Sequence, residues 1–219
     1  MTERVVLPLQ TADGKPLLHA YQRHIAGVES LAIGFPGNHY GVDGPLLYYP
    51  LSILKEAGWD TLTMAYGYQS NAEEFSSEKV PGILQEAQST FEMAMQMAGY
   101  KQVALLGKSL GAFVVAYLAA HAEGVEFARC IYLTPPIDNA YFLASLLDAS
   151  QASYLAIGTA DRYYDSEKLE EIRAAKNVTI RLIPDADHSL NLFPNMRSTL
   201  DALRLVTEEV VEFVAAGNR

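Results

Sequence analysis

A five-residue stretch near the middle of the chain, Gly107–Gly111, has the form Gly-x-Ser-x-Gly. An apolar run typical of a strand precedes it and a helical run follows, which places Ser109 in a sharp strand-to-helix turn. Such a turn holds the serine hydroxyl above the edge of a sheet, at a helix N-terminus that favours a developing anion. The spacing therefore predicts that Ser109 is a nucleophile. The alternative is a glycine-rich turn in which Ser109 only caps the helix.

A serine hydroxyl is a weak nucleophile until a base takes its proton, and five histidines could supply that base. His19 and His24 fall in or beside a predicted N-terminal hairpin, and His121 ends a helix on the far side of the sheet. His39 precedes the serine and lies on the side of the oxyanion loop. His188 lies in a polar loop after the last predicted strand, where it could reach the serine. We therefore expect His188 to be the base, against the alternative of an ordinary surface histidine.

The acid that orients the imidazole should lie between the serine and the histidine, after the strand predicted over Tyr154–Gly158. Asp161 is the first acid after that strand, so we favour it. Asp165 is the rival. Two further aspartates adjoin the histidine, Asp185 and Asp187, and we expect them to cap or brace its loop.

A tetrahedral intermediate needs two N–H groups to hold its oxyanion. Leu110 follows the nucleophile and should supply one of them. The second should come from the loop over Gly34–Gly41, after the third strand, where Asn38 is the favoured donor. The alternative is that the Pro-Gly pair in this loop marks an ordinary turn.

Short apolar runs rich in β-branched residues alternate along the chain with longer runs of helical period. An N-terminal hairpin is expected from Val5–Leu7 and Leu17–Tyr21, with a turn at Asp13-Gly14. The other expected strands are Ser30–Phe35, Thr61–Ala65, Gln102–Leu106, Arg129–Leu133, Ser153–Ile157 and Val178–Ile183. The expected helices are Leu46–Ala57 (broken by Pro50), Val80–Ala98, Ser109–His121, Tyr141–Asp148, Ser166–Lys176 and Met196–Ala216. This alternation predicts an α/β fold with a parallel sheet covered on both faces.

The composition favours one globular domain over residues 1–219, with 50% hydrophobic and 19% charged residues. A formal net charge of −10 disfavours nucleic acid and anionic membranes as partners. The single cysteine, Cys130, allows no intrachain disulfide, and no Cys/His cluster has zinc spacing, so no metal is expected. No apolar run reaches the roughly 18 residues of a membrane span, and no signal peptide is recognisable. We expect a cytoplasmic protein.

The terminal helix has an apolar face, formed by Leu200, Leu203, Val206, Val210 and Phe213. That face could be buried on the sheet or in a homodimer, and we favour the sheet.

The chain order Ser109, Asp161, His188, each residue after a predicted strand, resembles that of the α/β-hydrolase family. The resemblance extends over essentially the whole chain and implies a mostly parallel sheet of about eight strands, a serine nucleophile and no cofactor. The oxyanion loop departs from the family, because it reads Pro-Gly-Asn where many members have His-Gly and a variable residue. Lys108 occupies the variable position before the serine. It could bias the site towards anionic substrates, but we favour a solvent-facing side chain.

Only sixteen residues separate Pro136 from Ser153, which is too few for the helical lid of many lipases. We therefore expect no large cap domain, an open site and a small acyl substrate. The expected reaction is hydrolysis of a carboxylic ester or thioester through an acyl-enzyme, as in esterases and thioesterases. Dienelactone hydrolases resemble this architecture but carry a cysteine nucleophile. The alternatives are an amidase, peptidase, lactonase or acyltransferase with the same triad, or a non-catalytic binding protein of the same fold.

Overall fold

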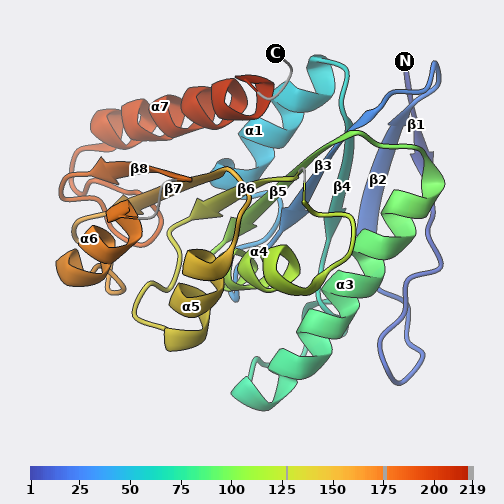
Figure 1. The fold of residues 1–219 in the computed structure, drawn as a ribbon, viewed down its shortest axis with the longest axis horizontal. Coiled ribbons are helices and arrows are strands. Elements are labelled where there is room, and N and C mark those ends of the chain that lie inside the picture. Colours follow the sequence, from blue (N-terminus) through green and yellow to red (C-terminus); the bar gives the residue numbers. More distant parts are fainter. Residues whose placement is uncertain (127, 175–176, 217–219) are drawn as a thin grey trace.

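The centre of the molecule is a twisted sheet of eight strands that lies between its helices (Figure 1). The structure is a computed structural model that describes residues 1–126, 128–174 and 177–216. The strands are β1 (Thr2–Val5), β2 (His19–His24), β3 (Ser30–Phe35), β4 (Asp60–Met64), β5 (Gln102–Lys108), β6 (Ala128–Leu133), β7 (Ser153–Gly158) and β8 (Val178–Ile183). Their spatial order is β1-β2-β4-β3-β5-β6-β7-β8. Among the strands in the described ranges, only the pairs made by β2 are antiparallel, so the expected mostly parallel sheet of about eight strands is confirmed.

Helices cover both faces of the sheet (Figure 1). They are α1 (Pro45–Glu56), α2 (Gly67–Ser70), α3 (Val80–Met97), α4 (Leu110–His121), α5 (Ala140–Asp148), α6 (Ser166–Ala174) and α7 (Met196–Ala215), with a 3₁₀ turn at Ser77–Lys79. The helices α1 and α7 lie on one face, and α3, α4, α5 and α6 lie on the other. The core is accordingly divided into two layers by the sheet.

The central strand β5 shows why these strands read as continuous apolar runs. Val103 and Leu105 point into the layer under α3 and α4, whereas Ala104 and Leu106 point into the layer under α1 and α7. Successive side chains of a strand face opposite sides, so a strand covered on both faces needs apolar residues at every position. The chain leaves this strand at its carboxyl end, where the serine turn begins.

Two local expectations were wrong. The first helix is not broken at Pro50, which lies buried inside α1. A proline removes one N–H donor and crowds the preceding turn, but the burial of this apolar ring offsets that cost. In the N-terminal hairpin, Thr2–Val5 pairs with His19–His24, so both strands are displaced from the expected ranges. The turn at Gly14 belongs instead to a smaller loop closed between Gln10 and Pro16.

The terminal helix α7 packs on the sheet with most of the expected face: Val206 and Val210 are buried, Leu203 and Phe213 are partly buried against the same core layer, and only Leu200 departs from the expectation. Its buried residues are Thr199, Ala202, Val206, Thr207, Val210 and Val214. Leu200 is 61% exposed and lies with Tyr49 and Ile53 along an apolar groove between α1 and α7. In the described ranges of the chain, no helix has both the length and the apolar character to cross a membrane.

Candidate active site

Three loops at the carboxyl edge of the sheet bring Ser109, Asp161 and His188 together. They follow β5, β7 and β8 respectively. The His188 Nε2 atom lies 2.9 Å from the Ser109 Oγ atom. On the other side of the ring, His188 Nδ1 lies 2.9 and 3.0 Å from the two carboxylate oxygens of Asp161. These distances allow a proton to pass from the hydroxyl to the imidazole while the carboxylate holds the ring.

The turn that carries Ser109 is strained and very tightly packed. Ser109 has φ = 54° and ψ = −111°, a region that non-glycine residues rarely occupy. The two glycines that flank it have no space for a side chain. A Cβ atom on Gly107 would lie 2.1 Å from the Gly111 carbonyl oxygen, and one on Gly111 would lie 2.1 Å from the Phe35 carbonyl oxygen. The glycines therefore let the turn close around the serine.

The acid and the base differ in their access to solvent. The Asp161 side chain is fully buried and also accepts a hydrogen bond from the Tyr163 N–H at 3.0 Å, whereas the His188 side chain is 21% exposed. The ring of Tyr163 packs edge-on against the imidazole, with ring centroids 5.1 Å apart. The rival acid, Asp165, accepts the N–H groups of Glu167 and Lys168 and so caps α6. Of the two candidates, the structure places Asp161 against the histidine.

The loop that carries His188 is braced by its own side chains and by β7. Asp187 accepts hydrogen bonds from the N–H groups of Ser189 and Asn191, at 2.7 and 2.9 Å. Asp185 has φ = 59° and contributes through its main chain, whose N–H donates to the Thr159 hydroxyl. A Cβ atom on Gly158 would lie 2.0 Å from the Ala186 carbonyl oxygen, so the loop approaches β7 as closely as a backbone can.

The other histidines lie elsewhere. His19 accepts the Leu7 N–H within the N-terminal hairpin. His24 and His121 each contact a main-chain carbonyl, of Lys55 and Tyr117 respectively. His39 is exposed. In the part of the chain that the structure describes, no group of three His, Cys, Asp or Glu side chains could hold a metal ion.

The two N–H groups expected at the oxyanion have no hydrogen-bond partner among the described residues. Leu110 is the first residue of α4, and an N–H at that position has no acceptor within the helix. The Asn38 N–H lies in a tight turn closed by the bond from the Gly37 N–H to the Tyr40 carbonyl, 2.8 Å long. This turn lies over the serine loop, since a Cβ atom on Gly37 would be 3.2 Å from the Lys108 carbonyl oxygen.

The expectation that Lys108 faces solvent was wrong, because its side chain is buried beneath the Asn38 loop. The residue is 3% exposed, and its Nζ atom lies 4.8 Å from the centre of the Tyr40 ring. Burial lowers the pKa of Lys108 to about 8, although the nearby charges of Asp161 and Asp187 act in the opposite direction. The signal was available in the sequence: Lys108 continues the alternation of Ala104 and Leu106, which face the layer under α1 and α7.

One short element at the site was not predicted. Helix α2 begins three residues after β4, and side chains in and beside it contact the Asn38 loop. A single helical turn has no periodicity to recognise. The usable signal is its position, because Tyr66, Tyr68 and Gln69 directly follow a parallel strand at its carboxyl end, where the site lies.

A sequence model of the alpha/beta hydrolase domain matches residues 40–215 of this chain. The protein belongs to the α/β-hydrolase family. The matched range contains both the serine turn and the histidine loop, and the family resemblance seen in the sequence is thereby confirmed. No curated protein matches this α/β-hydrolase chain.

Solved structures with the same fold cover almost all of this α/β-hydrolase chain at low identity. A serine hydrolase without a lid from Xanthomonas campestris is 18% identical, with a TM-score of 0.70, over 97% of this chain and 94% of that one. An esterase from Pyrococcus furiosus is 15% identical, with a TM-score of 0.70, over 99% and 92%. A protein of Butyrivibrio proteoclasticus with ferulic acid bound is 16% identical, with a TM-score of 0.73, over 92% and 95%. These similarities establish the fold.

Proposed function

We propose that the protein is a serine hydrolase that cleaves a small carboxylic ester or thioester through an acyl-enzyme. The observation that carries this proposal is the continuous hydrogen-bonded chain from Ser109 through His188 to the buried Asp161. A nucleophile, a base and an orienting acid within hydrogen-bond distance of one another are the parts that acyl transfer requires.

In the first half of the reaction, the Ser109 oxygen attacks the acyl carbon and its proton passes to His188 Nε2. The carbonyl oxygen becomes an anion, which the N–H groups of Leu110 and Asn38 hold. When this intermediate collapses, the bond from the acyl carbon to the leaving oxygen or sulfur breaks. His188 gives its proton to that leaving group, and the acyl group remains as an ester on Ser109.

In the second half, a water molecule attacks the acyl-enzyme and its proton passes to His188. The resulting intermediate expels the Ser109 oxygen, which takes the proton back, and the carboxylic acid leaves. The role of Asp161 in both halves is to fix the ring and to stabilise the imidazolium. The strained turn contributes by holding the hydroxyl in one position before substrate binds.

The short connection between β6 and β7 supports a small substrate. It contains only α5, whose nine residues pack on α4 through buried Phe142 and Leu146. The fold likeness to a hydrolase described as lacking a lid, and to a structure with ferulic acid bound, is in keeping with an open site for small acyl compounds.

A fluorophosphonate probe tests the proposal directly. The purified protein should form a stoichiometric adduct that mass spectrometry locates on Ser109, and it should hydrolyse p-nitrophenyl esters from acetate to octanoate with a preference for short chains. Ser109→Ala should abolish both labelling and turnover, while Ser150→Ala, a change at an exposed serine, should alter neither. Absence of any adduct in folded wild-type protein would refute the assignment. Turnover of anilides or lactones in preference to esters and thioesters would instead redefine the substrate.

A further inference from the structure

Three side chains of one short segment donate hydrogen bonds to three successive carbonyls of the loop that carries Asn38. We call these side chains, Tyr66, Tyr68 and Gln69, the clasp. The bonds run from the Tyr66 hydroxyl to the Pro36 carbonyl (3.1 Å), from Gln69 Nε2 to the Gly37 carbonyl (2.8 Å), and from the Tyr68 hydroxyl to the Asn38 carbonyl (3.1 Å). Every carbonyl of this part of the loop is thus held on the side of α2.

The position of the Gly37 carbonyl determines the direction of the Asn38 N–H, because both belong to one peptide unit. A trans peptide unit is planar, and its C=O and N–H bonds point in opposite directions. The bond between Gly37 and Asn38 is trans. Because Gln69 holds the Gly37 carbonyl, it turns the Asn38 N–H away from α2. On its other side the loop packs against the serine turn. A Cβ atom placed on Gly37 would lie 3.2 Å from the Lys108 carbonyl oxygen.

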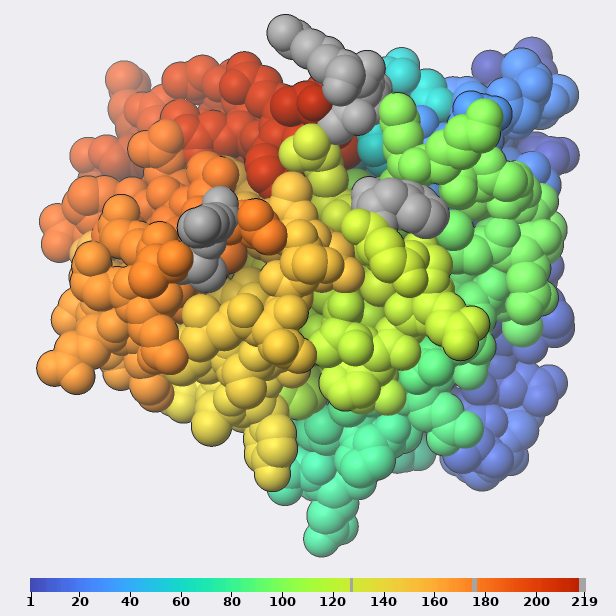
Figure 2. Space-filling model, in the orientation of Figure 1, coloured from blue at the N-terminus to red at the C-terminus, as the bar shows by residue number. Residues whose placement is uncertain are grey.

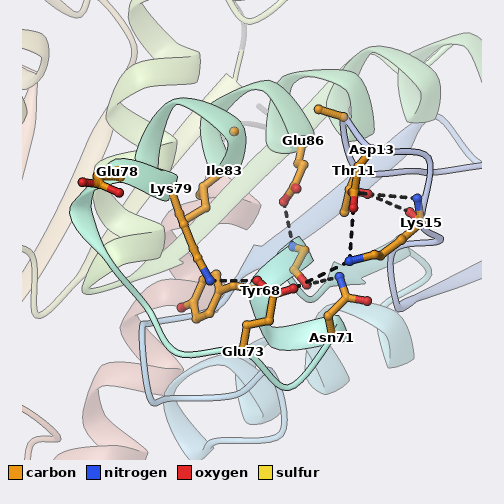
Figure 3. A pocket seen from close by; sticks show the side chains of 13 residues that line it. Thr11, Asp13, Lys15, Tyr68, Asn71, Glu73, Glu78, Lys79, Ile83 and Glu86 are labelled. Carbon is orange, nitrogen blue, oxygen red and sulfur yellow. Dashed lines mark hydrogen bonds and ion pairs between the residues drawn. The ribbon is translucent and has the colours of Figure 1, made fainter.

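The clasp is itself fixed in place. Gln69 Oε1 accepts the Tyr66 N–H at 3.1 Å, and the rings of Tyr66 and Tyr68 stack with centroids 6.2 Å apart. The carboxylate of Glu86, buried on α3, accepts the Gly67 N–H at 2.8 Å. Figure 3 shows Glu86 reaching from α3 to the start of α2, with Tyr68 across the same polar cavity of about 320 Å³. The donors of the clasp therefore have little freedom to follow a displaced loop.

We infer that Gln69, assisted by Tyr68 and Tyr66, positions the Asn38 N–H as an oxyanion donor. The inference rests on the proposed function, and it adds residues that do not touch the reacting atoms. A donor stabilises the transition state only if it already points at the oxyanion when the charge develops. The Asn38 N–H has no partner among the described residues that would orient it from its own side. Its orientation depends on the carbonyl side, which the clasp controls.

Two substitutions that remove donors test this role. Gln69→Met removes the donor to the Gly37 carbonyl, and with it a longer bond of 3.3 Å to the Asn38 carbonyl, while keeping a side chain of similar length. Tyr68→Phe removes the hydroxyl while keeping the ring stacked on Tyr66. The control is Tyr21→Phe, which removes a buried, hydrogen-bonded hydroxyl that is remote from the site.

The measurements are kcat and KM with p-nitrophenyl butyrate, and the Ki of phenylboronic acid, which forms a tetrahedral anion on a nucleophilic serine. Loss of a whole oxyanion donor costs about 10²–10³-fold in kcat, and misaiming one should cost less. For Gln69→Met we expect a fall in kcat of about 10–100-fold and a rise in the boronate Ki by a similar factor, with KM within about 3-fold of wild type. For Tyr68→Phe we expect the same pattern at about 3–10-fold. Tyr21→Phe should lower only the unfolding midpoint.

Several results would overturn the inference. Unchanged kcat and boronate Ki in folded Gln69→Met and Tyr68→Phe would do so, as would an effect on KM alone. An equal loss of kcat in Tyr21→Phe would show that lower stability alone reduces kcat, wherever the removed hydroxyl lies. If Gln69→Met does not fold, Tyr68→Phe decides alone. Failure of the proposed function is distinguishable, because wild-type protein would then give no adduct on Ser109 and no turnover, which would overturn both.

Discussion

Two chains of hydrogen-bonded side chains lie at opposite ends of the same sheet. At the carboxyl end, Ser109 contacts His188, which contacts Asp161. At the amino end, the Tyr21 hydroxyl lies 2.5 Å from the Tyr100 hydroxyl, which lies 2.5 Å from a carboxylate oxygen of Asp60. Each chain thus ends on a buried aspartate and links three side chains. Only the first has the composition of a reactive site.

The difference lies in the middle group and in access to solvent. Burial raises the pKa of Tyr100 far above its ordinary value, so this phenol keeps its proton at any physiological pH. All three side chains at the amino end are buried. At the carboxyl end, an imidazole stands in the middle position with 21% of its side chain exposed. A buried polar chain becomes a candidate for catalysis when its central group can exchange a proton near neutral pH and a substrate can reach it.

The backbone shows the same contrast. Four of the five non-glycine residues with positive φ in the described ranges lie in the segments that follow the carboxyl ends of β5, β6 and β8: Ser109, Thr134, Asp185 and Leu190. Strain of this kind persists only where the surrounding structure imposes it, and it concentrates where geometry must be set in advance. The amino end of the sheet needs no such imposed geometry.

Removing the aspartate charge at each end of the sheet should separate an effect on catalysis from an effect on stability. In Asp161→Asn the ring of His188 loses its acceptor and can adopt the wrong tautomer, so kcat should fall about 10³–10⁴-fold with little loss of stability. In Asp60→Asn activity should be unchanged, whereas the free energy of unfolding should fall by about 3 kcal/mol, because Tyr100 and Arg23 lose a buried anion. Ester turnover and urea unfolding of both variants check this. Loss of kcat in Asp60→Asn would contradict the separation.

Lys108 extends the comparison, because it is a buried cation beside the hydrogen-bonded side chains Ser109, His188 and Asp161. Its pKa is about 8 in the folded protein and near 10.5 when unfolded, so the unfolded state binds more protons between these values. The charged lysine therefore destabilises the fold below pH 8, and this penalty disappears as pH rises towards 10.5. We expect Lys108→Met to be more stable than wild type at pH 7, by about 3 kcal/mol at most, with the difference shrinking by pH 10.

Urea unfolding of wild type and Lys108→Met at both pH values measures this effect. Comparison of the two proteins at each pH cancels the titration of the buried tyrosines. A stability difference that does not vary with pH would show that the ammonium is stabilised by contacts other than those described.

The smallest expected effect concerns Glu86, the buried carboxylate under α2. Burial raises its pKa above the ordinary 4.5, so the ionised group costs stability at neutral pH, and this cost disappears as pH falls from the raised pKa to 4.5. Glu86→Gln keeps an oxygen that can accept the Gly67 N–H. It should gain about 1 kcal/mol at pH 7 and nothing at pH 4. Thermal unfolding at the two pH values checks the sign, and a loss at pH 7 would show that the charge itself holds α2.

The sequence allowed the sheet and the order of the candidate triad to be predicted, because both depend on local signals. Apolar runs marked the parallel strands, and the residues 109, 161 and 188 each follow one of them. The burial of Lys108 was not predicted, because a charged side chain was expected to face solvent. The alternation of side chains along the strand, however, places Lys108 on a buried face. Pro50 was taken as a break because the tertiary contacts that retain it in α1 are not visible locally. The clasp could not be predicted, since its bonds join segments about 30 residues apart across a one-turn helix.

The place of β8 at the edge of the sheet has a consequence for heat inactivation. Among the described residues this strand pairs only with β7, and the loop that follows it carries His188. Edge strands open at a lower free energy than the strands they adjoin, so local opening can withdraw the imidazole while the central strands stay paired. The proposed catalyst would then lose turnover on warming before its ellipticity changes, and would recover it on cooling. The highest temperature at which the protein turns over substrate would then be set by the stability of the edge strand β8 rather than by that of the core.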